Sequence, residues 1–390
     1  MTPLLSIIIP TADRQDCAAK AISAATAACP EAEIVVSDTS VSEGLMALLP
    51  PQIAARVLYV RPGVGLDVVS NFNAAAAAAT GQWLTFLGDD DCVGPRIADI
   101  AAWAEGTGLD AVVSYGSAFA AIYYWPGVTS RHFGDGYASK LIINRFSGRA
   151  RPLDAKAAVR VALDDLGSGL GWMARAYHGL VSRRLVQAII DRHGALFGGV
   201  SPDIYSAALI SMMSRKSAVV DWPFILPGAS PRSTAGLGAA QSDRSTLWTN
   251  PHIAPFQDLV WDPLIPEFYS PTTVWSYSFK KAVDAVNDPS LRPNLARLYA
   301  RCLFHNRNYA DATWTAVDAW GDTGITGAKS RVLAELAGEG GRFGLRIAKR
   351  LLTPRAEGAA VHVESNVPDV EAAYFALDGW LMANSRLMLE

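Results

Sequence analysis

Three consecutive aspartates, Asp89, Asp90 and Asp91, follow an apolar segment and are the most chemically informative feature of the sequence. Adjacent carboxylates repel one another, and their burial without partners is costly. A hard divalent cation is a common reason to gather oxygen ligands at a strand end. Because alternate residues of an extended segment point the same way, Asp89 and Asp91 would share such an ion and Asp90 would point elsewhere. The alternative is a solvated acidic turn ahead of a helix near Pro95.

The aspartates end one of five short apolar segments that alternate with alanine-rich stretches over the first 115 residues. We expect strands at residues 5–9, 33–37, 56–60, 83–87 and 111–115, and helices at residues 13–28, 67–80 and 95–106. Near-continuous apolar strands are typical of a parallel sheet that is buried on both faces. The alternation predicts a doubly wound, Rossmann-like α/β fold, in which ligands bind beyond the carboxyl ends of the strands.

Composition divides the chain into three parts. Residues 1–226 carry the α/β pattern, residues 227–250 predict a flexible linker rich in Gly, Ser and Pro, and residues 251–390 predict a helical C-terminal domain. Residues 228–236 of the linker include hydroxyl side chains and Arg232. This loop is interpreted either as a lid that closes over the ligand edge or as a plain connection.

Charge and cysteine content exclude several classes of protein. The 34 basic and 37 acidic residues give a net charge of −3, whereas general nucleic-acid binding requires a basic surface. The four cysteines form no CxxC pair and no zinc-ligand spacing, which fits a reducing cytoplasm. No apolar stretch of about 18 residues predicts a membrane span, and residues 5–9 are interpreted as a strand and not as a signal peptide.

Two C-terminal segments predict contacts with partners. Residues 341–352 form a basic amphipathic stretch. It predicts either peripheral contact with the inner face of the membrane or an ordinary solvated helix face. Residues 370–388 predict an amphipathic helix that packs on the α/β domain or joins two copies of the chain in a homo-oligomer.

The motifs of the first 95 residues, taken in order, resemble the family 2 glycosyltransferases, which have a GT-A fold. They are LSIIIPT at residues 5–11, EIVVSDTS at 33–40, Gly65 followed by NFNA at 71–74, ATGQW at 79–83 and the three aspartates. A second stretch, from YHGLV at 177–181 to SPDIY at 201–205, resembles the acceptor half of the same domain.

The resemblance implies a donor site in which several residues bind the nucleotide. The turn after the first strand, with Pro10, Thr11 and Asp13 or Arg14, frames the nucleotide base. Asp38, the acid at the end of the second strand, hydrogen-bonds to the base, and Asn71 lines the nucleotide pocket. The residues alone leave alternatives open. Asp38 is also typical of an Asx turn before Thr39, and Asn71 of a polar surface position.

For the aspartates, the resemblance implies a Mn²⁺ or Mg²⁺ ion on Asp89 and Asp91 that bridges the two phosphates of a nucleotide-sugar. Asp90 would contact the donor ribose or sugar, or orient the loop. Gly88 stands where many members of the family have another acid, so the ligand pair is open to a shift by one position.

Transfer with inversion needs a general base for the acceptor hydroxyl, and Asp203 in the SPDIY motif is the candidate. A predicted helix start there favours the ionised carboxylate, although an ordinary N-cap has the same pattern. His178 and Trp172 are candidates for the acceptor pocket. Each has a core-packing alternative.

The resemblance thus implies an inverting, metal-dependent glycosyltransferase. It would move a sugar from a nucleotide-sugar, in the first instance a UDP-sugar, to a hydroxyl of a glycan or lipid-linked acceptor in surface polysaccharide or glycan biosynthesis. A sugar nucleotidyltransferase is the second hypothesis, but it requires a glycine-rich phosphate loop where residues 10–14 read PTADR. A non-catalytic binding or assembly module with a glycosyltransferase-like fold is the third.

Overall fold

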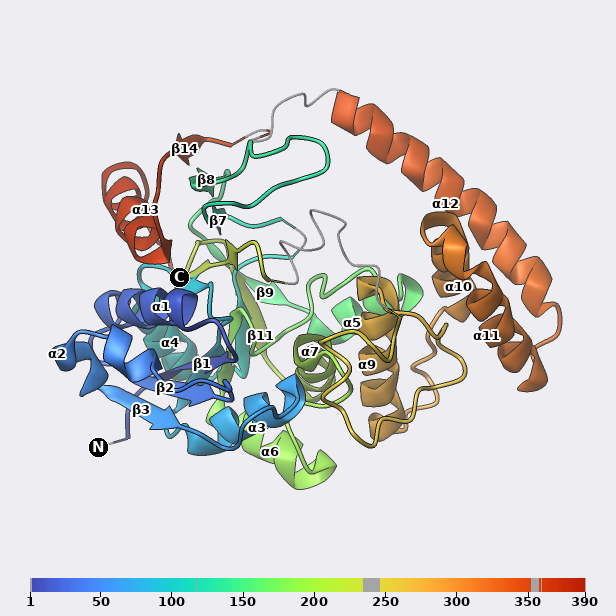
Figure 1. The fold of residues 1–390 in the computed structure, drawn as a ribbon, viewed down its shortest axis with the longest axis horizontal. Helices are drawn as coiled ribbons and strands as arrows, with labels where there is room; N and C mark the ends of the chain where they lie inside the picture. Colours follow the sequence, from blue (N-terminus) through green and yellow to red (C-terminus); the bar gives the residue numbers. More distant parts are fainter. Residues whose placement is uncertain (1, 117, 234–245, 352–357, 359, 390) are drawn as a thin grey trace.

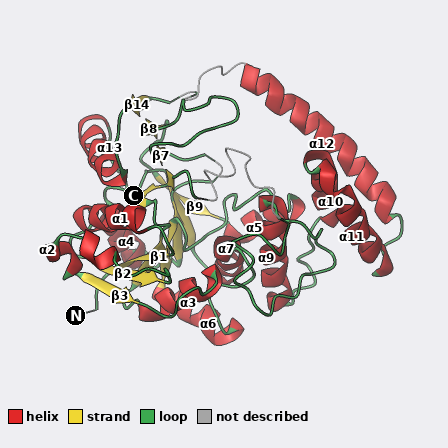
Figure 2. Ribbon diagram, viewed as in Figure 1, coloured by secondary structure: helices red, strands yellow, loops and turns green. Residues whose placement is uncertain are grey.

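All five expected strands form, and they lie in one eight-stranded sheet of the computed structural model (Figures 1 and 2). The structure describes residues 2–116, 118–233, 246–351, 358 and 360–389, with the side chains of residues 346–351 left out. The strand order is β3-β2-β1-β4-β10-β6-β11-β9. The bounds of these strands, in that order, are Val57–Val60, Glu33–Asp38, Leu5–Thr11, Trp83–Phe86, Gly179–Ser182, Ala111–Val113, Ser217–Val220 and Ala150–Leu153.

The sheet is parallel in its first half and mixed in its second. Strand β1 runs parallel to both β2 and β4, and β2 runs parallel to β3. Strand β10 lies antiparallel between β4 and β6, and β9 is antiparallel to β11. The carboxyl ends of β1, β2 and β4 therefore meet at one edge, as the predicted α/β fold requires.

Helices cover both faces of the sheet, and adjacent residues of β1 point to opposite sides. Ile8 belongs to the core beneath α3, α5, α6 and α7, whereas Ile7 and Ile9 belong to the core beneath α1, α4 and α13. This explains the continuous apolar pattern of the strand. The helices span Gln15–Ala28 (α1), Val68–Ala78 (α3), Ile97–Gly106 (α4), Ala155–Asp164 (α5), Arg183–His193 (α6) and Pro202–Met213 (α7); the shorter turns are η1, Leu45–Leu48, and α2, Pro51–Ala54.

Two small sheets extend the α/β part beside the ligand edge. Strand β12 (Ile225–Leu226) pairs with β5 (Cys92–Val93), immediately after the three aspartates. A four-stranded sheet has the order β13-β7-β8-β14, with bounds Gly228–Ala229, Ala121–Tyr124, Lys140–Ile143 and His362–Glu364. The first residues of the expected linker are thus strands of the α/β part.

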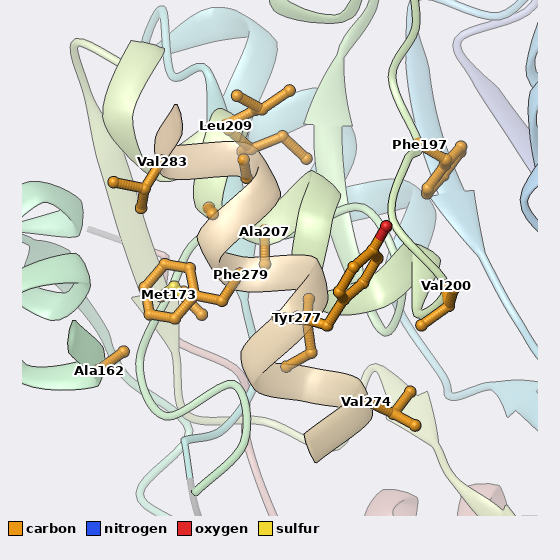
Figure 3. Close-up of a cluster of buried hydrophobic side chains, with 14 of the residues drawn as sticks. Ala162, Met173, Phe197, Val200, Ala207, Leu209, Val274, Tyr277, Phe279 and Val283 are labelled. Carbon is orange, nitrogen blue, oxygen red and sulfur yellow. The ribbon is translucent and has the colours of Figure 1, made fainter. Parts of the chain in front are cut away.

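The expected helical region beyond residue 251 contains α9 (Pro271–Val286), α10 (Leu295–His305), η2 (Arg307–Tyr309), α11 (Ala310–Asp322), α12 (Ala328–Leu351) and α13 (Val370–Asn384). Its first helix shares a core with the α/β part: Val274, Tyr277 and Phe279 of α9 lie among side chains that include Met173 and Leu209 (Figure 3). Strand β14 and helix α13 return to the α/β part, where α13 packs on α1. The region is therefore continuous with the α/β part at both ends.

Helix α12 runs along the outer side of α10 and α11, far from the large sheet (Figure 1). Phe343 and Leu345, within the predicted membrane-contact stretch, are exposed on it. Among the described residues, none of the helices combines the length and the apolar character needed to span a bilayer.

Candidate active site

The first-half strands bring polar side chains to one edge of the sheet. Thr11 pairs with Asp38 in the β1–β2 register, and the aspartate turn follows the end of β4. The Thr11 hydroxyl donates a 2.7 Å hydrogen bond to Oδ2 of Asp89. Residues from three separate motifs therefore contact one another at the carboxyl ends of β1, β2 and β4.

Arg14 binds two of the three aspartates. Its Nη1 lies 2.6 Å from Oδ1 of Asp89, and its Nη2 lies 3.0 Å from Oδ2 of Asp90. The two carboxylates are only 5% and 4% exposed. A single guanidinium is therefore the shared counter-ion of adjacent, buried carboxylates.

Asp91 points away from Arg14 and accepts four hydrogen bonds. The donors are the backbone N–H groups of Gly88 and Gly228, both at 2.7 Å, the Tyr177 hydroxyl at 3.0 Å and Nε2 of His178 at 2.5 Å. Asp89 and Asp91 were expected to point the same way, but in the structure Asp89 and Asp90 share a partner, Arg14, and Asp91 has other partners. The reason is that residues 88–91 form a turn, closed by Asp91 N–H on Gly88 O, and the alternation of an extended strand does not apply.

The electrostatics of the cluster follow from burial. Burial raises the pKa of Asp89 to about 7, with repulsion from Asp90 adding to it and the Arg14 charge opposing it. The pKa of Asp90 is raised by burial and by Asp91. Burial acts in the same sense on Asp91, but His178 and the backbone N–H groups outweigh it, so its pKa is lowered. The charge of Arg14 therefore does not fully offset the burial and mutual repulsion of Asp89 and Asp90, and a further positive charge beside them would lower their pKa.

A divalent cation fits this cluster in kind, because the donors are hard carboxylate oxygens with surplus negative charge. The described residues contain no set of three or more His, Cys, Asp or Glu side chains arranged as a ligand cage. The four hydrogen bonds of Asp91 occupy its oxygens, whereas Asp89 and Asp90 face the Arg14 cation. Asp89 and Asp90 are thus the two carboxylates that would hold an ion.

The nucleotide candidates lie around the β1–β2 seam. Asp38 is fully buried; its Oδ1 accepts the N–H of Ser40 in an Asx turn, and its Oδ2 accepts the Tyr59 hydroxyl at 2.7 Å. Asn71 is also buried, so it is not a polar surface residue. Its Nδ2 donates to the carbonyl of Thr11, while its Oδ1 has no hydrogen-bond partner among the residues that the structure describes.

The turn after β1 is braced by the loop after β2. Pro10 is buried within β1, and Asp13 is exposed with a φ of +53°. The Asp13 N–H donates to the Ser40 hydroxyl, and its Oδ1 accepts the N–H of Val41. Arg14, the next residue, reaches inward to the aspartates and not outward to a base.

Gly228 and Ser230, the first part of the expected lid, contact the aspartate turn directly. Ser230 N–H donates to Oδ2 of Asp90 at 3.0 Å, and the Ser230 hydroxyl accepts a hydrogen bond from Arg14. A Cβ atom on Gly228 would lie 1.8 Å from the carbonyl oxygen of Asp90, so only glycine permits this approach. Residues 234–236 of the lid hypothesis lie outside the described residues. The lid hypothesis includes Gly228 and Ser230 but gives neither a role of its own, and Tyr177 is named only within the YHGLV motif.

Asp203 lies in the first turn of α7, where Ser201 and not Asp203 is the N-cap residue. The Ser201 hydroxyl donates to Oδ1 of Asp203 at 2.6 Å. Burial and then the charges of Asp91, Asp90 and Asp203 raise the pKa of Tyr177. Tyr177 is therefore within electrostatic reach of both the aspartate turn and Asp203.

The two acceptor candidates have different surroundings. Trp172 is 42% exposed and packs against Gly116, and the Arg151 guanidinium lies 4.7 Å from the centre of its ring. His178 is buried and bonded to Asp91 and to the Tyr115 hydroxyl. The structure thus places His178 beside the aspartate turn and leaves Trp172 at the surface.

Comparison with solved structures found similar structures of low sequence identity, among them the following three. S. aureus TarS 1–349 in complex with UDP-GlcNAc is 12% identical, with 87% of this chain and 92% of that chain covered and a TM-score of 0.41. The mannosyltransferase PcManGT from Pyrobaculum calidifontis, in complex with GDP-Man and Mn²⁺, is 13% identical, with 99% and 89% covered and a TM-score of 0.41. A longer S. aureus TarS structure is 15% identical, with 58% of this chain covered and a TM-score of 0.38; the match spans 37% of that chain.

Comparison with curated proteins found no match. Residues 6–145 match the sequence model described as glycosyl transferase family 2. That range contains β1, β2, β4, Arg14 and all three aspartates. The resemblance noted from the sequence motifs is therefore confirmed for residues 6–145, which match the family 2 glycosyltransferase model and contribute strands to the large mixed sheet.

Proposed function

We propose that the protein is an inverting glycosyltransferase that transfers a sugar from a nucleotide-sugar to an acceptor hydroxyl. The observation that carries the proposal is the convergence of Thr11, Asp38, Asn71 and the aspartate turn at one sheet edge, within the part that matches the family. The donor is a UDP-sugar in the first instance. The acceptor is a glycan or a lipid-linked glycan, in surface polysaccharide or glycan biosynthesis.

The nucleotide binds over the β1–β2 seam, against Pro10, Thr11, Asp13, Asp38 and Asn71. Asn71 supports this placement, because its buried Oδ1 is an acceptor to which none of the described residues donates. A carboxylate has about four lone-pair sites, so Asp38 accepts a base N–H beside its bonds to Ser40 and Tyr59.

The diphosphate lies against Asp89, Asp90 and Arg14. Asp89 and Asp90 would hold a Mn²⁺ or Mg²⁺ ion, which would supply Lewis-acid chemistry by neutralising charge on the leaving diphosphate. This shifts the second ligand by one position from Asp91, whose oxygens accept four hydrogen bonds. Arg14 adds a fixed positive charge on the same side of the turn.

Asp203 acts as the general base. It takes the proton of the acceptor hydroxyl as that oxygen bonds to the anomeric carbon, and the bond to the diphosphate breaks on the opposite face, which inverts the centre. Support for the role comes from Ser201, which donates to one carboxylate oxygen and holds the side chain. Trp172 and Arg151 form an exposed aromatic and cationic surface for the acceptor.

The test is a thermal-shift screen of UDP, GDP, TDP and CMP, each with Mn²⁺, with Mg²⁺ and with EDTA. We expect one nucleoside diphosphate to raise the melting temperature, and EDTA to remove the effect. A sugar nucleotidyltransferase would instead respond to nucleoside triphosphates. Absence of any response to nucleotides would contradict the donor site and favour a non-catalytic module.

The remaining expectations stay predictions. Peripheral membrane contact through residues 341–352 has Phe343 and Leu345 as exposed apolar groups, with side chains from 346 onward outside the described part. A homo-oligomer contact through residues 370–388 would use only the surface of α13 that does not already pack on α1.

A further inference from the structure

A line of three buried polar side chains runs from the aspartate turn to the end of β6. Nε2 of His178 lies 2.5 Å from Oδ2 of Asp91, and Nδ1 of His178 lies 2.7 Å from the Tyr115 hydroxyl. His178 and Tyr115 are 8% and 7% exposed. The sugar transfer proposed above gives neither residue a role, although His178 lies beside the aspartate turn.

His178 adopts a backbone conformation that histidine rarely takes. Its φ is +59°, in the left-handed region where the Cβ atom of most residues is strained and where glycine or asparagine is better tolerated. Its N–H donates to the carbonyl of Phe86, so the segment is bound to the end of β4. Strained residues of this kind are concentrated at functional sites, and here the strain directs the imidazole at Asp91.

Hydrogen-bond chemistry assigns a direction to the line. An ionised Asp91 only accepts, so Nε2 of His178 carries the proton and donates to it. On its other side the ring is held by the hydrogen bond between Nδ1 and the Tyr115 hydroxyl. Tyr115 thereby keeps the imidazole in the orientation in which Nε2 faces Asp91.

Tyr115 is itself held in place by packing. The guanidinium of Arg175 lies 4.5 Å from the centre of its ring and donates to the Tyr115 carbonyl, and Arg175 is fully buried. The Phe119 ring meets the tyrosine edge-on at 4.5 Å. A substitution that removes only the hydroxyl would leave all of these contacts in place.

We infer that His178 and Tyr115 are positioning residues for the donor site. They hold Asp91 against the N–H groups of Gly88 and Gly228, and so fix the turn that presents Asp89 and Asp90 to the diphosphate. The inference rests on the proposed function, since it assigns these residues an effect on nucleotide binding. Neither residue touches the substrate.

The experiment compares H178N and Y115F with the wild type. Isothermal titration with UDP and with GDP, each with Mn²⁺, gives the Kd, and thermal unfolding gives the Tm. We expect the Kd of the better diphosphate to rise roughly tenfold in H178N, as for other residues that orient a ligand-binding side chain. The Tm of H178N should fall modestly, because Asp91 and Tyr115 lose a buried partner while asparagine tolerates the left-handed conformation better. Y115F should raise the Kd with a similarly modest fall in Tm, and both variants should stay folded at the temperature of the titration.

Y123F is the matched control. Tyr123 is another buried tyrosine, whose hydroxyl donates to the carbonyl of Val367 away from the aspartate turn, so its loss should leave the Kd unchanged. A Kd that stays at the wild-type value in both H178N and Y115F would overturn the inference. The same conclusion would follow if Y123F raised the Kd as much as Y115F does.

Hydrogen exchange separates this inference from the proposed function. The amides of Gly88 and Gly228 should exchange faster in H178N and Y115F than in the wild type, since Asp91 is their acceptor. This readout needs no nucleotide. If the wild type binds neither diphosphate, the proposed donor site fails, and the exchange rates still decide whether the two residues position Asp91.

Discussion

Arg14 and Asp89 form a direct ion pair, with Nη1 of the arginine 2.6 Å from Oδ1 of the aspartate. The pair joins the turn after β1 to the turn after β4, and Arg14 extends it to Asp90 and Ser230. This edge of the sheet is therefore organised around one arginine, which lies 75 residues before Asp89 in the chain.

Arg14→Met should destabilise the protein by about 3 kcal/mol, because loss of one partner leaves adjacent buried carboxylates without their counter-ion. Urea unfolding at neutral pH measures the change. Arg14→Lys is the control: it keeps the charge but not the two-nitrogen fork, so its loss should be smaller. An unchanged free energy of unfolding in Arg14→Met would show that the ion pair does not stabilise the fold.

Stability should fall as the pH rises from about 4 to about 7. Asp89 has a folded-state pKa of about 7, above its ordinary value of 3.8. The folded state therefore keeps a proton that the unfolded state has lost, and that advantage disappears as the pH approaches the folded-state pKa. The difference in unfolding free energy between the wild type and Asp89→Asn should show this decline and then level off above pH 7. A flat difference across the window would mean that Asp89 titrates normally.

Asp203→Asn should reduce kcat by about 100- to 10,000-fold, since the amide cannot take the acceptor proton. The Kd of the nucleoside diphosphate should be unchanged, because Asp203 lies on α7 and not at the β1–β2 seam. Asp154→Asn is the control: Asp154 is the N-cap residue of α5, where its side chain accepts the N–H of Ala157, and its replacement should leave kcat unchanged. Weaker nucleotide binding in Asp203→Asn would assign Asp203 to the donor site.

Gly228→Ala should abolish nucleotide binding, because the added Cβ would meet the carbonyl oxygen of Asp90 at 1.8 Å. The backbone cannot yield without breaking the hydrogen bonds of Gly228 and Ser230 to the aspartates. Gly341→Ala is the control, since nothing lies within 4 Å of its Cβ position on α12. That change should leave binding intact and stabilise the helix by about 1 kcal/mol at most. Wild-type affinity in Gly228→Ala would show that the backbone at Gly228 does not lie against the carbonyl of Asp90.

The sequence by itself determined the layered α/β fold, the main strand and helix positions of the first 115 residues, and the family resemblance of residues 6–145. These features depend on local patterns: apolar runs such as LSIIIPT form buried strands, and alanine-rich stretches form the helices between them. The expected and observed strands agree because a strand buried on both faces has a continuous apolar pattern that is readable without knowledge of its neighbours.

Only the tertiary structure decided which groups the three aspartates contact. Strand periodicity paired Asp89 with Asp91, but a turn at residues 88–91 directs Asp90 to Arg14 and Asp91 to His178. The partner of Asp91 on the linker side, Gly228, is 137 residues away, and Ser230 lies 140 residues from Asp90. Such contacts follow from strand order, with β10 inserted antiparallel beside β4, and no local pattern of residues specifies that order.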